Sequence, residues 1–307
     1  MAKEYVDQHI VPKRYLDRFA FQANGKNVIG TRYTKNNEIR LFEQSTENVG
    51  YIKDYYTVTD KDDPKHWEHF FAEQIDTLCG KQLENIVSRC LLTNNKAIVL
   101  DDSKKEVLAK IIMAQLMRVP SSVYFFKENI PQIYSKVATP YLSIFPKEMA
   151  DHLEDKIQAI VFSEQWQKEQ FLNHSFDQRR FLWYCSILQK RMWVVYLNLY
   201  EAEMPFITSD NPVLVEGIGK AEIGLFKNGL ISPRTCIFFP ITPKLAVANY
   251  SQDGIIGVAE HDIRDRIIAI KELSFVMDKN LKIIKQAYQH AFIPKQLYDE
   301  IKGSLNS

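Results

Sequence analysis

Three residues that lie far apart in the chain, His9, Glu68 and Asp210, have side chains that could move protons or hold a metal ion. A histidine titrates near neutral pH and can act as a base or a ligand, and carboxylates can act as acids, bases or ligands of hard cations. Side chains of this kind that meet in a folded chain form a composite active site. We therefore expect His9, Glu68 and Asp210 to be catalytic and to be the ligands of a divalent metal cofactor, Mg²⁺ or Mn²⁺.

A second group of residues could bind an anion. Gln115 and Arg118 are three positions apart, so they are neighbours on one face of a helix. An amide and a guanidinium placed in this way can clamp a carboxylate or a phosphate, and they could equally satisfy the C-terminus of the helix. Together with positions in the motifs described below, the expected ligand-binding residues are Lys13, Tyr15, Gln115, Arg118 and Ser209.

Each of these residues also has a purely structural interpretation. His9 could hydrogen-bond the start of a helix, and Asp210 could close an Asx-turn that Pro212 fixes. A buried ion network is a further alternative, because a buried charge without a partner is costly. Its members would be Glu68, Asp76, Arg118 and Asp210.

The segment His9-Ile10-Val11-Pro12 is similar to the His-Ile-x-Pro that opens ββα-metal nuclease motifs. Those motifs also need an asparagine and a second histidine within a few dozen residues. Several asparagines follow, but the next histidine is His66, so the nuclease motif is incomplete. The chain also lacks the glycine-rich GxGxxG and Walker A loops, the GxSxG elbow and paired CxxC motifs.

The composition is that of a soluble globular protein, with 46% hydrophobic and 25% charged residues. The 39 basic residues nearly balance the 38 acidic ones, which argues against coating of a long polyanion. Basic residues exceed acidic ones over positions 1–40, which favours a local patch for one anionic ligand. The N-terminus has no apolar core of a signal peptide and no apolar stretch is long enough to cross a bilayer, so we expect a cytoplasmic protein without membrane contact.

The elements that must position these residues follow from hydrophobic periodicity. Residues 28–60 alternate apolar and polar side chains and predict a β-hairpin or meander, with a further short strand at 55–58. Apolar residues then recur at helical spacing from position 64, and Ser103 with Glu106 resembles a capping box at the start of the next helix. Further helices are predicted at 121–133, 147–173 and 176–189.

Strands and helices mix in the last third of the chain. Strands are predicted at 192–199, 206–208, 213–215, 235–241 and 246–250, helices at 258–275 and 293–303, and a strand at 274–277. We expect an α+β fold in which a helix-rich central block joins an N-terminal β region to a C-terminal set of strands around one shared core. The expected single domain covers 1–307, with parts at 1–60, 61–190 and 191–307, because no linker separates them.

Five motifs in this order resemble the family catalogued as domain of unknown function 4238. The first is H-x-x-P-x-x-Y-L-x-x-F, matched by His9, Pro12, Tyr15, Leu16 and Phe19. An aromatic-Tyr-Ser/Thr segment matches Tyr55, Tyr56 and Thr57, and an acidic amphipathic helix is matched loosely by Glu68 and Asp76. The last two are Q-x-x-R-x-P at 115–120 and F-I-T-S-D-N-P at 206–212, with an apolar strand-Pro-strand following at 239–247. The resemblance implies site residues and no established reaction.

Two functions fit these residues. One is a metal-assisted hydrolase that acts on a phosphodiester in a nucleotide or nucleic acid, with His9, Glu68 and Asp210 at the reacting centre and Arg118 with Lys13 stabilising the anion. The other is a non-catalytic binding or sensor module in which Arg118, Lys13 and Gln115 hold a small anionic ligand. The sequence does not indicate an oligomeric state.

Overall fold

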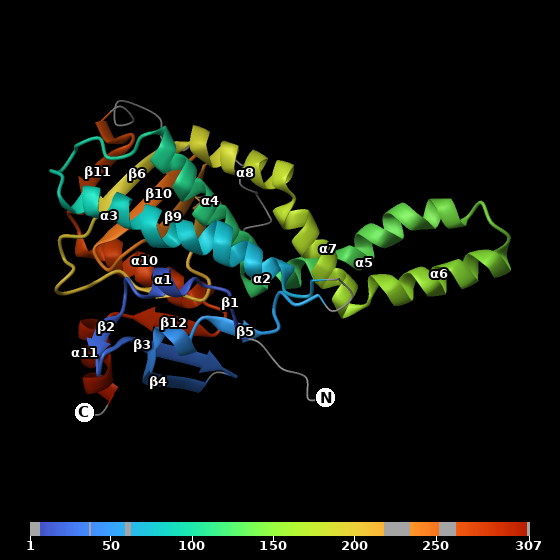
Figure 1. Ribbon diagram of the computed structural model, residues 1–307, viewed down its shortest axis with the longest axis horizontal. Helices are drawn as coiled ribbons and strands as arrows, with labels where there is room; N and C mark the ends of the chain where they lie inside the picture. The colour runs from blue at the N-terminus through green and yellow to red at the C-terminus, as the bar shows by residue number, and fades with distance from the viewer. Residues whose placement is uncertain (1–6, 37, 59–62, 218–233, 252–261, 306–307) are drawn as a thin grey trace.

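The computed structural model describes residues 7–36, 38–58, 63–217, 234–251 and 262–305, and it has the expected α+β architecture (Figure 1). A protruding pair of helices extends from a body that contains two five-stranded sheets and a small two-stranded one. One sheet has the strand order β2-β3-β12-β7, with β4 paired to β3, and the other has the order β11-β6-β10-β9-β8. Both therefore combine strands that are far apart in the sequence.

The N-terminal strands form the predicted meander. Its elements are β1 (Asp7–His9), α1 (Lys13–Leu16), β2 (Phe21–Ala23), β3 (Lys26–Lys35), β4 (Glu38–Ser45) and β5 (Tyr51–Lys53). Asn24 and Gly25 both have positive φ, 51° and 74°, which suits the tight turn between β2 and β3. The strand predicted at 55–58 is wrong: β5 ends at Lys53, and beyond it the Tyr56 N–H and the Thr57 hydroxyl bond the Gln8 side chain instead of joining a ladder.

The central block is helical. It contains α2 (His66–Phe70), two π-helical segments (Phe71–Asp76 and Leu78–Gln82), α3 (Leu83–Leu91), α4 (Asp102–Arg118), α5 (Pro120–Leu142), α6 (Lys147–Val161), α7 (Glu164–Phe176) and α8 (Gln178–Lys190). The predicted helix at 147–173 is in fact two, because Ser163 caps a new helix by accepting the N–H of Trp166. The helix predicted at 121–133 is longer than expected and continues to Leu142.

Helices α5 and α6 run side by side away from the body (Figure 1). Their tip and outer faces expose large apolar side chains, of which Ile144 is 76% and Tyr141 69% exposed. Among the described residues, no helix is long and apolar enough to cross a membrane.

The C-terminal part contributes all five described strands of the second sheet. Its elements are β6 (Met192–Leu197), β7 (Thr208–Ser209), β8 (Leu214–Gly217), β9 (Thr235–Pro240), β10 (Leu245–Tyr250), β11 (Arg266–Ala269), α10 (Leu273–Gln286), β12 (His290–Ile293) and α11 (Lys295–Leu305). The helix predicted at 258–275 is wrong at residues 266–269, which pair in parallel with β6, whereas residues 273–275 are helical at the start of α10. The strand predicted at 274–277 lies inside α10, whose apolar face packs on the second sheet through Val276 and Ile283.

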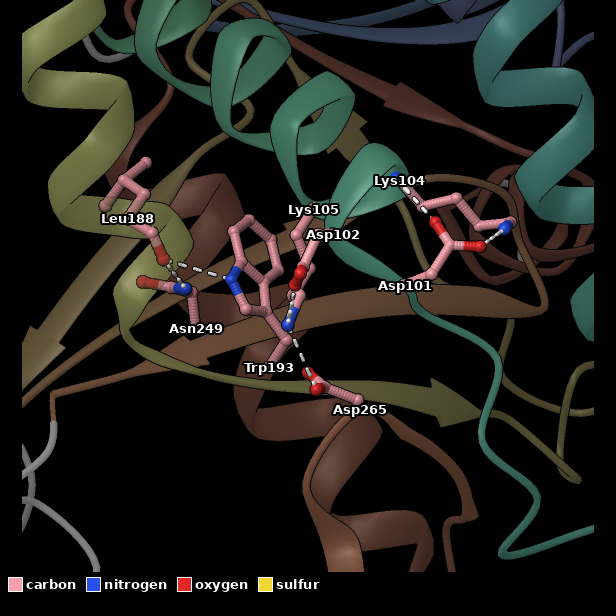
Figure 2. A network of polar contacts seen from close by, with 8 residues as sticks. All are labelled: Asp101, Asp102, Lys104, Lys105, Leu188, Trp193, Asn249 and Asp265. Carbon is pink, nitrogen blue, oxygen red and sulfur yellow. Dashed lines mark hydrogen bonds and ion pairs between the residues drawn. The ribbon is translucent and has the colours of Figure 1, made fainter.

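Polar contacts attach α4 and α8 to the second sheet (Figure 2). Asp101 accepts the N–H of Lys104 at 2.9 Å, so Asp101 caps α4 in place of the predicted capping box. Lys105 pairs with Asp265 at 3.2 Å, just before β11. At the other end of the network, Trp193 Nε1 and the Asn249 amide both donate to the Leu188 carbonyl at the end of α8, each at 3.0 Å.

One buried cluster draws on all three parts of the chain. It includes Val11 and Tyr15 from the N-terminal segment, Ile112 from α4, and Trp193 and Phe239 from the second sheet. Residues 10–19 are therefore packed inside the molecule, between the helical block and the strands.

Candidate functional site

The N-terminal segment is held by the two polar residues of α4. The Gln115 amide donates to the Ile10 carbonyl at 2.9 Å, and an Arg118 guanidinium nitrogen donates to the His9 carbonyl. From the other side, the N–H groups of Ile10 and Val11 bond the Gly50 carbonyl at 2.8 and 3.1 Å. Gln115 and Arg118, which were predicted to clamp a ligand, thus hydrogen-bond the backbone carbonyls of Ile10 and His9 instead.

Arg118 is 1% exposed and its other donors are also used within the chain. Nε donates to the Tyr56 hydroxyl at 3.0 Å, and Nη1 pairs with Asp76 at 3.4 Å. The guanidinium lies 4.7 Å from the ring centroid of Phe71, close enough for a cation–π contact. Burial acts against the charge of Arg118, but Tyr56 and Asp76 outweigh it and raise its pKa. Arg118 and Gln115 are therefore positioning residues in this structure.

Gln8, which no sequence pattern indicated, also anchors the segment around His9 through its side chain. Its side-chain carbonyl accepts the N–H of Tyr56 at 2.5 Å. Its amide donates to the Thr57 hydroxyl at 3.0 Å and to Glu68 Oε2 at 3.2 Å. Of the predicted catalytic carboxylates, Glu68 on α2 is thus bound to Gln8, and Gln8 links it to the Tyr56-Thr57 segment.

The His9 imidazole differs from the side chains of Gln8, Gln115 and Arg118 because one of its nitrogens has no hydrogen-bond partner among the described residues. That nitrogen, Nε2, is buried. The ring also hydrogen-bonds the backbone of Thr46, and because Nε2 is unpaired we assign this bond to Nδ1. Burial lowers the pKa of His9; Asp76 opposes that shift, and Arg118 and Lys13 reinforce it. His9 is therefore neutral at pH 7, with the lone pair on Nε2.

Asp76 lies beside this histidine at the end of the first π-helical segment. Burial raises the pKa of its carboxyl, while Arg118, His9 and Arg14 oppose the shift. The side chain is still 31% exposed, so it is not sealed from water.

The sequence carries a signal for the two π-helical segments: buried residues fall at every fourth position, Trp67, Phe71, Ile75, Cys79 and Leu83. A repeat of four is too long for a straight α-helix and suits a widened one.

A groove of about 400 Å³ opens beside the second π-helical segment. We call it the cationic groove, and its lining residues are Arg14, Asp17, Arg18, Gly80, Lys81 and Glu84. Arg18 donates to the carbonyls of Cys79 and Gly80, both at 2.9 Å, and so ties α1 to the widened helix. A Cβ on Gly80 would lie 2.5 Å from Arg14 Nη1, so the missing side chain makes room for that guanidinium.

The remaining motif residues bond elsewhere. The Tyr15 hydroxyl lies 2.7 Å from the Thr208 hydroxyl and donates to the Pro240 carbonyl at 2.7 Å, which joins α1 to both sheets. Ser209 closes a local turn with Asn211, and the Asp210 carboxylate accepts the N–H groups of residues 288, 289 and 290 at 2.7, 2.8 and 2.8 Å. Lys13 pairs with Asp17 at 3.2 Å.

The family model described as a protein of unknown function, DUF4238, matches residues 7–295. The chain belongs to the DUF4238 family. No curated protein and no solved structure matches it. The matched range includes every described residue of the cationic groove and of the contacts around His9, so both lie within the DUF4238 domain.

The predicted metal site does not form. Over the parts of the chain that the structure describes, no three His, Cys, Asp or Glu side chains gather in a way that could hold a metal ion. His9, Glu68 and Asp210 all belong to those parts, and Glu68 and Asp210 bond to an amide and to backbone N–H groups respectively. The donor set thus does not fit Mg²⁺ or Mn²⁺, which take several oxygen ligands at one point.

Proposed function

We propose that this DUF4238 protein binds a small phosphate-bearing anion in the cationic groove and that His9 acts as the base in hydrolysis of a phosphodiester held there. The observation that carries the proposal is the unpaired Nε2 of His9, in a ring that is neutral at pH 7. A neutral imidazole can take a proton from an attacking water. The substrate class remains the expected one, a phosphodiester in a nucleotide or a nucleic acid fragment.

The groove would supply the positive charge that such a reaction needs. Arg14, Arg18 and Lys81 line it, and guanidinium groups bind phosphate oxygens through paired N–H donors. The groove residue Gly80 follows Asp76 by four positions along the widened helix, and Arg14 favours the charged form of the Asp76 carboxyl, so we infer that the groove and the His9–Asp76 pair adjoin. The nearly balanced charge of the chain suits one short anion rather than a long nucleic acid.

The proposed hydrolysis step does not require ligands that hold a metal ion. The water oxygen bonds to phosphorus as the ester P–O bond breaks, the water proton passes to His9 Nε2, and the leaving oxygen takes a proton from solvent. Cationic side chains stabilise the charge that develops on the phosphoryl oxygens. Gln115 and Arg118 would contribute indirectly, by fixing the backbone that carries the imidazole.

The test is hydrolysis of bis(4-nitrophenyl) phosphate by the full chain in the presence of EDTA. We expect His9→Gln to lower kcat by about 100-fold or more, the usual contribution of a general base. His66→Gln is the matched control, because His66 is an exposed histidine at the start of α2. Equal turnover by the His9→Gln variant, or activity that requires added Mn²⁺, would contradict the proposal.

A second variant tests the groove separately from the base. Lys81 is exposed and lines the groove, so Lys81→Met should raise KM by about threefold to tenfold without changing kcat. Lys65→Met, at an exposed lysine just before α2, is the control for the lost charge. An unchanged KM in the Lys81→Met variant would remove the groove from the proposal.

A non-catalytic binding module is the second candidate, and one observation favours it. His9 Nε2 is buried, so a substrate reaches it only if the surroundings move. In that case inorganic pyrophosphate should bind the native chain in isothermal titration calorimetry and bind the Lys81→Met variant more weakly, while phosphodiester turnover is absent from both.

A further inference from the structure

The helical hairpin of α5 and α6, which extends away from the body, carries a set of exposed apolar side chains (Figure 1). Six of them are between 53% and 76% exposed. We call these six residues the hairpin face: Ile133, Val137, Tyr141, Ile144, Met149 and Ile160. A contiguous apolar surface of several hundred Å² on one chain usually marks an interaction site.

The exposed apolar side chains of both helices lie on one side of the hairpin. Positions 134, 138 and 142 of α5 and positions 150, 153, 157 and 161 of α6 are half-buried or buried at helical spacing, so these are the sides on which the two helices pack. Every helical member of the hairpin face comes one position before one of them, which is a rotation of about 100° in the same sense on each helix. Because α5 and α6 are antiparallel, equal rotations seen from each N-terminus bring both sets to the same side.

The hairpin face is large enough for the apolar part of a stable interface. A large apolar side chain has roughly 100 Å² of apolar surface when it is fully accessible, so the six residues together offer about 400 Å². A standard protein–protein interface buries about 800 Å² on each partner, of which about 57% is apolar. The hairpin face therefore comes close to the apolar area that one partner contributes to such an interface.

The charges beside the hairpin face are complementary about its middle. Val137 on α5 and His152 on α6 are equally far along the chain from the centre of the turn at 143–146. Lys156 and Glu148 lie four positions on either side of His152, and both are exposed. Lys156 comes one position before a residue that faces α5, so it belongs to the same side as the hairpin face, and Glu148 lies at the edge of that side, next to Met149. Opposite charges placed in this way would pair if two copies of α6 lay antiparallel.

We propose that the hairpin face binds the hairpin face of a second copy of this chain, about a two-fold axis level with Val137 and His152. Each helix would lie antiparallel to the same helix of the other copy, and the four helices would form a bundle with the two bodies at opposite ends. Val137 would meet Val137 of the second copy, and Lys156 of each copy would meet Glu148 of the other. A two-fold interface requires such self-complementary pairs, whereas a lipid surface or an unrelated protein does not.

Sedimentation velocity of the full chain over a range of concentrations tests the dimer. We expect a reversible monomer–dimer equilibrium that Val137→Glu weakens by about 100-fold or more, because two carboxylates would then meet at the axis. The variant should fold, since Val137 is 59% exposed. Leu92→Glu is the matched control: it adds the same charge at an 89% exposed leucine that follows α3, outside the hairpin, and should leave the dimerisation constant unchanged. A chain that stays monomeric at all concentrations, or a dimer that Val137→Glu leaves intact, would overturn the proposal.

A charge exchange tests the axis itself. Lys156→Glu and Glu148→Lys should each weaken dimerisation by about tenfold, because like charges then meet at two symmetric places, and the double variant should restore the native constant. A double variant as weak as the single ones would overturn the proposed pairing. Sedimentation of a monomeric chain with phosphatidylcholine vesicles, lost in Val137→Glu, would instead assign the hairpin face to a lipid surface and overturn the dimer. None of these measurements depends on the cationic groove or on hydrolysis.

Discussion

Replacing Arg118 with methionine should destabilise the protein strongly, because three acceptors lose their donor at once. The Tyr56 hydroxyl and the His9 carbonyl keep only a long hydrogen bond to each other, at 3.5 Å, and the loss of the Arg118 donors costs about 1–3 kcal/mol for each group. Asp76 loses its partner too, but its side chain is 31% exposed and water can replace part of that contact. Methionine recovers some of the packing on Phe71. We expect the free energy of unfolding to fall by about 4 kcal/mol, the usual range for a broken buried pair.

Urea denaturation followed by tryptophan fluorescence measures this change, since the chain has four tryptophans and Trp67 lies in α2 next to the affected residues. Arg118→Lys keeps the charge and loses the forked geometry, so its loss should be about half as large. Arg40→Met is the control: Arg40 pairs with Glu38 on exposed β4, with 69% and 71% exposed side chains, and should change stability by less than about 0.5 kcal/mol. A loss below about 1 kcal/mol for Arg118→Met would refute the assignment of Arg118 as the fixing residue of this segment.

Three further predictions concern other fixed points. The lowered pKa of His9 means that the unfolded chain takes up a proton first on acidification; native stability should therefore fall as pH drops below 6.5, and His9→Gln should reduce that slope in urea titrations between pH 7 and pH 5. Asp210→Ala should lower thermal stability and the free energy of unfolding by about 3 kcal/mol, because three backbone N–H groups lose their acceptor; a loss under 1 kcal/mol would contradict this. Gly80→Ala should displace Arg14 and weaken pyrophosphate binding in calorimetry about threefold or more, and unchanged binding would remove Arg14 from the groove.

The sequence predicted local elements better than it predicted contacts between them. The hairpin at 28–45 was visible because strand alternation and turn residues are encoded within a few positions. Parallel pairing of β11 with β6 was missed, since residues 266–269 carry no helix-breaking signal and pair with a strand about 70 positions earlier. The π-helical segments were missed because a four-residue repeat was counted as ordinary helical spacing.

The sequence predicted individual residues of the candidate site but not the contacts that join them. Gln115 and Arg118 were recognised as neighbours because a regular helix fixes their spacing. Their partners were not, because the His9 and Ile10 carbonyls are backbone groups that every sequence contains. Gln8 had no pattern of its own: its bonds join residues 48 to 60 positions away, and only tertiary packing defines them.

The backbone carbonyl of His9 contributes to stability, whereas its imidazole Nε2 would carry the proposed chemistry. Substitutions around His9 must therefore be interpreted with both effects measured. The carbonyl of His9 holds Arg118, and that contact survives any change of the His9 side chain. Nε2 belongs to the side chain alone and holds nothing in the described structure. A loss of activity in an Arg118 variant is therefore informative only after its free energy of unfolding is known. A loss in His9→Gln with stability preserved at pH 7 would instead report on the imidazole itself.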